Sequence, residues 1–365
     1  MFSRLKNFIC RHRRKFIVTG VVLGGTIFAI NYVQRKFLEW QEKEAREFFR
    51  KAKKEQHFKT TERTCNQTIF SLSKTLKESI FQSLNSDVIL QKIREGESSR
   101  VPLWEELKVV VFAQICALIY SGMMLVTLLR IQLNIIGGYM IREKDISELT
   151  NASQEKYLSL CQHFLEVAVK DICALMLKHS ELILKNVSLK HKMTLKDIEH
   201  VFWRLESSLN QDPLNPIKNL SLYLIPPENE KFIGDDEAQF FKNIVSETVD
   251  LLQHEEVLSV CESSIKRAFS NTVDKIAEYY IPADFENGKV SKNGCTSEIL
   301  YNGKIVNMTD VTVHLAKLVP ILHGLYRGSA HNGSPDPWIE QFIVMDQMNN
   351  LGLDIYETYS FEESI

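Results

Sequence analysis

The side chains that could do chemistry are numerous in this chain, but they are not grouped in a known catalytic pattern. The 365 residues include ten His and seven Cys, yet the phosphate-binding loop, zinc-protease and nucleophile-elbow motifs are missing. His191 and His200 lack the spacing of metal ligands, so we expect both to be surface residues. Glu105 and Glu106 are typical of a solvated helix face. The motifs therefore indicate neither metal nor covalent chemistry, although a site assembled from distant positions stays open.

The cysteines are scattered, and none forms a C-x-x-C pair. Their number is odd, and several lie in apolar helical surroundings, as Cys116 does. This pattern predicts buried free thiols in a reducing compartment, and not a disulfide framework or a zinc site. The seven are Cys10, Cys65, Cys116, Cys161, Cys173, Cys261 and Cys295.

Binding chemistry is better indicated in the segment Val101–Lys108, which reads VPLWEELK. Four apolar side chains, two of them in the preceding helical segment, could form one surface: Ile89, Ile93, Trp104 and Leu107. Three cations would flank this surface: Arg94, Arg100 and Lys108. An exposed Trp with a basic rim is a typical hot spot for an amphipathic, partly acidic helix. The alternative is a core Trp at a helix start, which periodicity alone favours.

The charges are strongly polarised along the chain. The net charge is −2, but residues 1–60 carry fifteen Lys and Arg against five Glu, which gives +10 there and −12 over the remainder. A basic end beside an apolar segment suits an anionic membrane surface better than nucleic acid. We therefore expect a membrane lipid partner and no nucleic acid.

Residues 16–33 form an uncharged apolar run that is long enough to cross a bilayer as a helix. No small-residue cleavage site follows, so the run predicts a retained anchor and not a signal peptide. Both flanks are basic, which leaves the orientation undetermined. The expected organisation is a basic segment at 1–15, the anchor at 16–33, a charged helical connector at 34–56 and a large helical domain at 57–365.

The large domain shows helical periodicity almost throughout, with no convincing strand pattern and no repeat. Residues 61–94 carry apolar positions at helical spacing, Gly96–Ser99 interrupt them, and Pro102 suits a first helical turn. Val109–Leu129 is an uncharged run that is either a second span or a buried helix of an α-bundle. Further helices are expected at 153–181, 194–209, 237–253, 257–280, 309–326 and 336–350. Loops are expected at 210–236 and 284–307.

Several segments, in order along the chain, resemble the peroxin-3 family of peroxisome-biogenesis proteins. The clearest are His57-Phe58, Arg63–Thr68 (RTCNQT), Leu128–Tyr139 (LLRIQLNIIGGY) and Val187–His191 (VSLKH). Weaker similarity covers the N-terminal anchor, Trp104–Lys108 and Leu315–Ile321. The two expected loops look divergent, so nothing is carried over there.

The resemblance implies an all-α fold: an elongated helical bundle with a central buried apolar helix, preceded by a single N-terminal transmembrane helix. Val109–Leu129 would be the central helix. Residues 1–15 would face the peroxisomal matrix, and the bulk of the chain would face the cytosol. The family is a docking receptor for peroxin-19, the import receptor for peroxisomal membrane proteins, which inserts an N-terminal amphipathic helix into a groove.

The resemblance also implies which residues line the groove. Trp104 and Leu107 match the family's groove tryptophan and leucine, and Ile93 replaces a groove leucine, a change that conserves volume. The basic rim would include Arg94, Arg100 and Lys317. No enzyme activity, cofactor, metal or small-molecule substrate is implied.

The sequence is therefore compatible with three functions, and a docking receptor is the leading one. The second is a membrane-anchored scaffold that tethers organelles or cytoskeleton, and a pull-down would distinguish it, since a receptor predicts peroxin-19 as the dominant partner. The third is a membrane-bound enzyme, which a deep polar pocket with convergent ionisable groups would support.

Overall fold

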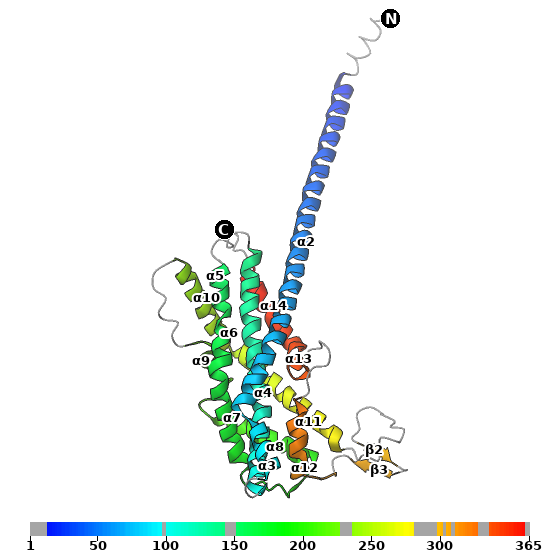
Figure 1. The fold of residues 1–365 in the computed structure, drawn as a ribbon. Coiled ribbons are helices and arrows are strands. Elements are labelled where there is room, and N and C mark those ends of the chain that lie inside the picture. Colours follow the sequence, from blue (N-terminus) through cyan, green and yellow to red (C-terminus); the bar gives the residue numbers. More distant parts are fainter. Residues whose placement is uncertain are drawn as a thin grey trace. The chain divides into compact units, whose positions relative to one another are not determined.

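The chain divides into two compact units, Met1–Lys59 and Thr60–Ile365. Helix α2, Arg13–Ser83, belongs to both units, and the other labelled elements belong to the second (Figure 1). The computed structural model describes residues 13–96, 100–142, 151–226, 236–280, 298–301, 304–307, 311–327 and 336–361. The fold of these residues is all-α, as expected.

In the first unit, α2 is a charged helix whose residues 34–53 are all exposed. Its charges pair along the helix at i,i+4 spacing, as in Arg46–Glu42 (3.3 Å) and Lys59–Glu55 (2.6 Å). Such exposed pairs are screened by solvent and contribute little to stability. The predicted anchor at 16–33 is part of α2, and its side chains lie outside the described set together with residues 1–12.

In the second unit, the remaining part of α2 packs one stripe of side chains into the core. The stripe recurs at helical spacing and comprises Cys65, Ile69, Leu76 and Ile80, all fully buried. The helix predicted to run over 61–94 is split after Ser83. Asn85 begins α3, Ser86–Glu95, where its side chain accepts a hydrogen bond from the Val88 amide (3.2 Å). Gly96, with φ of 75°, ends α3 in the left-handed conformation that favours glycine.

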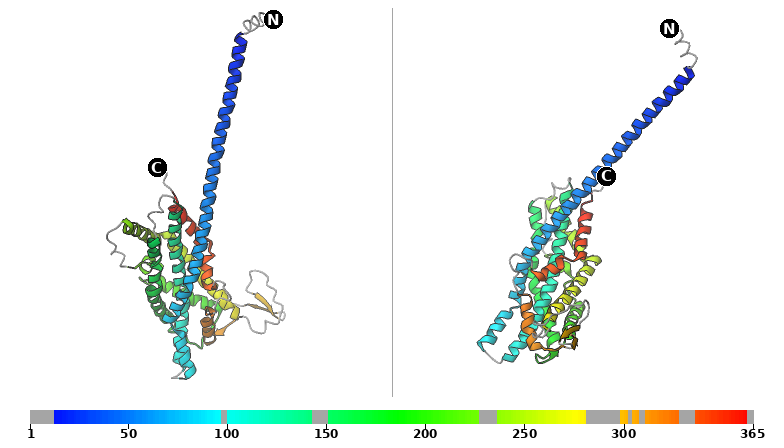
Figure 2. Two further views of the ribbon diagram at one scale, coloured as in Figure 1. Left: turned by 45° about the horizontal axis from the view of Figure 1, so that its top comes forward. Right: turned by 90° about the vertical axis from the view of Figure 1, so that its right-hand side faces the viewer.

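The centre of the second unit is helix α4, Arg100–Ile141. It packs against α3, α7, α11, α12, α13 and α14, and Figures 1 and 2 show it between these helices. Among the described residues it is the one helix long and apolar enough to span a membrane, and its most apolar stretch is 94% buried by protein. From periodicity and composition alone, Val109–Leu129 could be either a second membrane span or a buried bundle helix. The structure confirms that it is a buried bundle helix.

Several polar side chains along α4 are buried and donate hydrogen bonds inside the protein. Gln114 Nε2 donates to the Leu84 carbonyl (2.6 Å), and Gln132 Nε2 donates to the Tyr157 carbonyl (2.7 Å). Arg130 is 1% exposed and donates to Asn349 Oδ1 (3.0 Å). A buried polar group without such a partner costs on the order of 1–3 kcal/mol. These bonds therefore fix the position of α4 against its neighbours.

The paired glycines of α4 mark a close helix approach and not a turn. A Cβ on Gly137 would lie 2.8 Å from Thr61 Cγ2, and one on Gly138 would lie 2.5 Å from Tyr359 Cβ. Both distances are too short for a real side chain, so α2 and α14 reach the backbone of α4 only because these positions are glycine.

Most of the other helices agree with the expected ranges apart from a few boundaries, but α9, Leu220–Leu224, lies within the loop that was expected at 210–236. Thr194 and Asp197, whose Thr-x-x-Asp spacing is typical of a capping box, form one at the start of α8. The helix predicted at 336–350 is two helices divided at Val344. The remaining helices are α5 Asn151–Leu158, α6 Leu160–His163, the π-helix η1 Phe164–Ala168, α7 Val169–Leu184, α8 Leu195–Gln211, α9 Leu220–Leu224, α10 Asp236–Gln253, α11 Glu255–Ala277, the 3-10 helix η3 Glu278–Tyr280, α12 Leu315–Leu325, α13 Pro337–Ile343 and α14 Asp346–Tyr359.

Four short strands were not predicted. Strand β1, Lys192–Met193, pairs antiparallel with β4, Val313–His314, and β2, Glu298–Tyr301, pairs with β3, Lys304–Asn307. Because β4 occupies residues 313–314, α12 begins later than the expected 309. Strands of two to four residues are too short to show a period of two in the sequence.

The cysteines in the described part of the chain are free and buried, as predicted. Burial raises the pKa of the Cys116 and Cys261 thiols to about 12, so neither is a thiolate at neutral pH. Cys10 and Cys295 lie outside the described residues. His191 and His200 are exposed, which also agrees with the prediction.

Candidate partner-binding site

The predicted binding residues come from three helices of the second unit, and α3 and α12 both pack on α4. Helix α3 carries Ile89, Ile93 and Arg94. The first turns of α4 carry Arg100, Trp104, Leu107 and Lys108, and α12 carries Lys317. Only residues 96–99 separate α3 from α4, so the end of one helix lies close to the start of the other.

The four apolar residues divide into a buried pair and a surface pair. Leu107 and Ile89 belong to the core, with 0% and 5% exposure. Trp104 and Ile93 are half-buried and pack on that core. Residues three and four apart share a helix face, which explains why each surface residue has a buried partner on its own helix. Trp104 thus has both a packed edge and an accessible one.

Two further apolar residues close to Trp104 in the chain are accessible and were not among the candidates named from the sequence. Val101 is 67% exposed, and Leu103 is half-buried against the core. On α3, Val88 is 45% exposed and Leu90 is half-buried. Val101 lies three residues before Trp104, a spacing that places the two on one helix face and could have indicated it. Large apolar side chains left accessible at neighbouring helix ends are typical of an interaction surface.

Three of the predicted rim cations are exposed. Arg94 lies in the last turn of α3, Arg100 at the first position of α4, and Lys317 in the first turn of α12. Exposed cations of this kind change the rate at which an acidic partner associates more than they change the affinity.

Lys108 lies differently from its predicted place on the rim. It is 1% exposed, and its Nζ donates to the carbonyls of Leu184 (3.1 Å) and Val187 (2.6 Å) and to Glu105 Oε2 (2.5 Å). Leu184 is the last residue of α7, where helical carbonyls have no partner within the helix. From inside the bundle, Lys108 therefore donates hydrogen bonds to carbonyls at the end of α7 and just after it. The sequence showed it only as one more cation near Trp104.

An ion pair connects the end of α12 to the start of α3. Arg327 donates to both oxygens of Asp87 (2.6 and 2.7 Å) and to Ser86 Oγ (2.8 Å). Burial, and then the charge of Arg327, lowers the pKa of the neighbouring His323. The pair helps to hold α12 beside α3, and with it the helix that carries Lys317.

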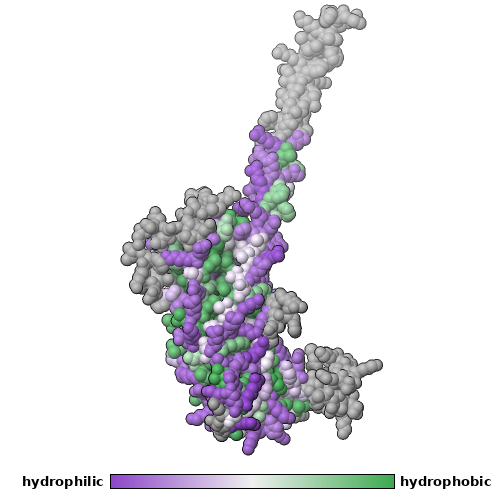
Figure 3. Space-filling model, in the orientation of Figure 1, coloured by the Kyte–Doolittle hydropathy of each residue, from purple (hydrophilic) through white to green (hydrophobic). Residues whose placement is uncertain are grey.

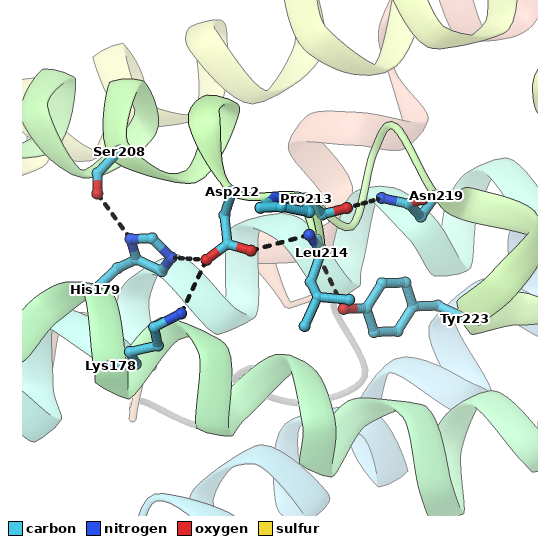
Figure 4. Close-up of polar contacts among 8 residues, drawn as sticks. All are labelled: Lys178, His179, Ser208, Asp212, Pro213, Leu214, Asn219 and Tyr223. Atoms are coloured by element: carbon cyan, nitrogen blue, oxygen red, sulfur yellow. Dashed lines mark hydrogen bonds and ion pairs between the residues drawn. The ribbon is translucent and has the colours of Figure 1, made fainter.

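A second group of polar residues, away from the predicted site, has a Ser–His–Asp arrangement (Figure 4). His179 Nδ1 lies 2.7 Å from Ser208 Oγ, and its Nε2 lies 2.9 Å from Asp212 Oδ2. Asp212 also accepts from Lys178 Nζ (3.0 Å) and from the Leu214 amide (2.9 Å). No motif in the sequence pointed to this group.

This polar group is best explained as a structural junction. His179 is 5% exposed, and Ser208 lines neither of the two hollows described below. A nucleophilic serine needs an accessible site for its substrate. Asp212 instead follows the last residue of α8 and accepts a hydrogen bond from the Leu214 amide. Its contacts with Lys178 and His179 connect this end of α8 to α7.

Replacing Asp212 by Asn should destabilise the fold in a pH-dependent way. The Leu214 amide, and next Lys178, lower the pKa of Asp212 to about 2. The stabilisation is therefore complete above the unfolded value, about 4, and is lost as the pH falls through 2. We expect Asp212→Asn to lower the free energy of unfolding at pH 7 by about 1–3 kcal/mol.

Urea denaturation of both proteins across acid pH measures this difference. Asp274→Asn, at an exposed position of α11, is the matched control and should change little. A difference for Asp212→Asn that did not shrink in acid would contradict the role of its charge.

Two hollows of the described surface contain none of the predicted residues. One, of 530 Å³, is lined by Trp203, Glu206 and Lys266 among others, and the other, of 700 Å³, by Leu72, Ser79 and neighbours. Burial raises the pKa of Glu206, which the charge of Lys266 partly offsets. Within the described residues, no three His, Cys, Asp or Glu side chains are grouped as metal ligands. The predicted binding surface is therefore formed by Trp104 and its neighbours, and neither hollow is part of it.

Comparisons with known proteins identify a family. Residues 7–101 match the sequence profile described as Peroxin-3. The chain is 30% identical to "Peroxisomal biogenesis factor 3" of Mus musculus over 385 residues and of Bos taurus over 386, each covering all of both chains. It is 20% identical to the protein of the same name from Yarrowia lipolytica, over 94% of this chain and 96% of that one.

Proposed function

Because the chain belongs to the peroxin-3 family, whose members act in peroxisome biogenesis and membrane protein import, we propose that it is the docking receptor for peroxin-19 at the peroxisomal membrane. The observation that carries this proposal is Trp104, half-buried on the core where the end of α3 meets the start of α4. The amphipathic N-terminal helix of peroxin-19 would pack its apolar side chains there.

The proposed contact combines buried and accessible apolar side chains. Leu107 and Ile89 are buried in the core, and Trp104 and Ile93 pack against the same core from the surface. A side chain already held by the core loses little conformational freedom when a partner covers it, so more of the apolar burial contributes to affinity. Val101 and Leu103 extend the apolar area beyond the residues expected from the sequence.

The proposal also includes a membrane topology. Residues 16–33 would be the single membrane anchor, with 1–15 on the matrix side and residues 34–365 in the cytosol, where the connector at 34–56 leads to the receptor domain at 57–365. Two features support it: the uncharged run of eighteen residues, and the burial of α4, the other long apolar segment, within the bundle. Resistance of the full chain to alkaline extraction from membranes, with the epitope of an N-terminal tag protected from added antibody, would test it.

Reversing two rim charges should slow association with peroxin-19. In Arg94→Glu with Arg100→Glu, an acidic partner helix would meet repulsion, so we expect the association rate at low salt to fall by about tenfold or more. The effect should weaken as salt is added, because exposed charges are screened. Stopped-flow fluorescence with a labelled peroxin-19 N-terminal peptide measures the rate.

A matched pair of substitutions controls for net charge. Lys196→Glu with Arg204→Glu makes the same change at two exposed positions of α8. We expect its association rate to stay within about twofold of the wild type, since steering depends on charge near the contact. Equal slowing by both pairs would mean that the rim residues have no special role.

A further inference from the structure

One of the two hollows, the one between helices α8 and α11, has no part in the function proposed above. It has a volume of 530 Å³, and its lining side chains come from both helices. None of the residues proposed to contact peroxin-19 lines it. On the face shown in Figure 3, hydrophobic residues of the second unit are mixed with hydrophilic ones. A further binding site on this unit therefore has to be identified from its chemistry, and not from a large apolar patch.

An exposed tryptophan lines the hollow. Trp203 is 58% exposed, and its ring stacks on that of His200, with the centroids 5.4 Å apart and the planes 14° from parallel. This stack holds the orientation of the indole and uses one of its two faces. Phe202 and Phe269, which are buried, also line the hollow. An indole face that is held in place and accessible is the best aromatic surface for a cation.

The charged groups of the hollow are mainly acidic. Glu199 and Glu206 line it together with one cation, Lys266, and Glu262 lies close enough to Glu206 to influence it. These three carboxylates and one ammonium group have a net charge of −2. The hollow therefore favours a positively charged ligand.

Glu206 is the carboxylate that a ligand would benefit most. It is half-buried, and within the described part of the chain it has neither a hydrogen-bond donor nor an ion-pair partner. Burial raises the pKa of Glu206, the charge of Lys266 lowers it and the charge of Glu262 raises it, and the effect of burial is the largest. A partly desolvated carboxylate without a donor costs free energy, which a cation that also donates hydrogen bonds would recover.

This combination fits the side chain of an arginine. A guanidinium group is planar, so it stacks on an indole face, and it donates two parallel hydrogen bonds to one carboxylate. A lysine would bring the charge without the planar surface. An anion would be repelled by the carboxylates, and a purely apolar ligand would cover Glu206 without giving it a donor.

We propose that the hollow between α8 and α11 binds an arginine of a partner peptide, with its guanidinium stacked on Trp203 and bonded to the carboxylate of Glu206. The volume lies within the range of ligand sites, roughly 300–1,000 Å³. Ser207, Asn210 and Ser270 also line the hollow, and their hydroxyl and amide groups can bond the peptide backbone on either side of the arginine. The site is independent of the docking of peroxin-19.

Titration of the full chain in detergent micelles with defined peptides tests this proposal. The probe is acetyl-Gly-Arg-Gly-amide, and the control peptide contains citrulline, which keeps the planar shape of arginine without its charge. Binding is followed by the emission of Trp203, which is isolated by subtracting the spectrum of the Trp203→Phe variant. We expect a saturable change with the arginine peptide and none with the citrulline peptide.

Two substitutions in the hollow should move the affinity in opposite directions. Glu206→Gln should raise the dissociation constant of the arginine peptide by about tenfold, since a neutral amide replaces the charged acceptor. Lys266→Met should lower it by about threefold, because the competing cation is removed. Glu181→Gln, at an exposed position of α7 outside the hollow, is the matched control and should stay within about twofold of the wild type.

Each outcome supports or overturns the proposal. Saturable binding that weakens in Glu206→Gln and strengthens in Lys266→Met supports it. An equal response to citrulline, no saturable change with the arginine peptide, or equal effects of Glu206→Gln and Glu181→Gln overturns it. Free arginine that binds as tightly as the peptide would overturn the docking of a peptide. Circular dichroism checks the fold of each variant, and Lys266, which is exposed, keeps the test decisive if Glu206→Gln does not fold.

Discussion

Replacing Trp104 by Ala is expected to weaken binding of the peroxin-19 N-terminal peptide by about 2 kcal/mol or more, roughly thirtyfold. The indole is packed on the core and remains partly accessible, so its removal takes away apolar surface that a partner helix could cover. Calorimetric titration of the full chain in detergent micelles measures the dissociation constant.

Trp203→Ala provides the matched control. Trp203 is 58% exposed on α8 and stacks on His200, with ring centroids 5.4 Å apart. Removing it deletes the same side chain from another helix, so the dissociation constant should hardly change. Helical content by circular dichroism should be preserved in both variants. An unchanged dissociation constant for Trp104→Ala would remove this residue from the contact, and loss of the fold would make it a core residue instead.

Replacing Lys108 by Met should destabilise the bundle by about 1–3 kcal/mol, since the carbonyl of half-buried Val187 loses the Lys108 donor and the Leu184 carbonyl keeps only its bond from the Val187 amide. Met keeps the apolar stem but cannot donate to Leu184 or Val187, whose carbonyls lie at the end of α7 and just after it. Glu105 would also lose its cation, although it is partly exposed and can be solvated. Urea denaturation followed by circular dichroism measures the change.

Lys317→Met is the matched control for this prediction. Lys317 is exposed on α12, so the same substitution should change the free energy of unfolding by less than about 0.5 kcal/mol. The two lysines are thus expected to affect different properties: Lys108 affects stability, and Lys317 affects the rate of peptide association. Equal stability of the two variants would show that the hydrogen bonds of Lys108 contribute little.

Much of the fold could be predicted because its signals are local. The apolar stripe of α2, the Thr194–Asp197 capping box and the glycine that ends α3 are each read within a few residues. The features that could not be predicted depend on how distant parts of the chain pack together. Whether Val109–Leu129 meets lipid or protein depends on the other helices that pack around it, and periodicity contains no information about them.

The site shows the same limit more sharply. Trp104, Leu107 and Ile93 could be proposed as site residues because a motif and a helical spacing mark them. The burial of Lys108 could not be predicted, since the two carbonyls that it binds lie more than seventy residues away in the chain, at the end of α7 and just after it. The group formed by His179, Ser208 and Asp212 was missed for the same reason: one member lies on α7 and the others at the end of α8.

The most direct measurement of the central claim is a photo-crosslinking map of the bound peptide. A photoreactive amino acid would replace Val101, which is 67% exposed beside Trp104, and in a second protein Leu182, which is 66% exposed on α7. With the peroxin-19 peptide at saturating concentration, the docking account predicts a strong crosslink from position 101 and almost none from position 182. A crosslink from 182 alone, or none from 101 while the peptide is bound, would place the contact elsewhere and contradict the account.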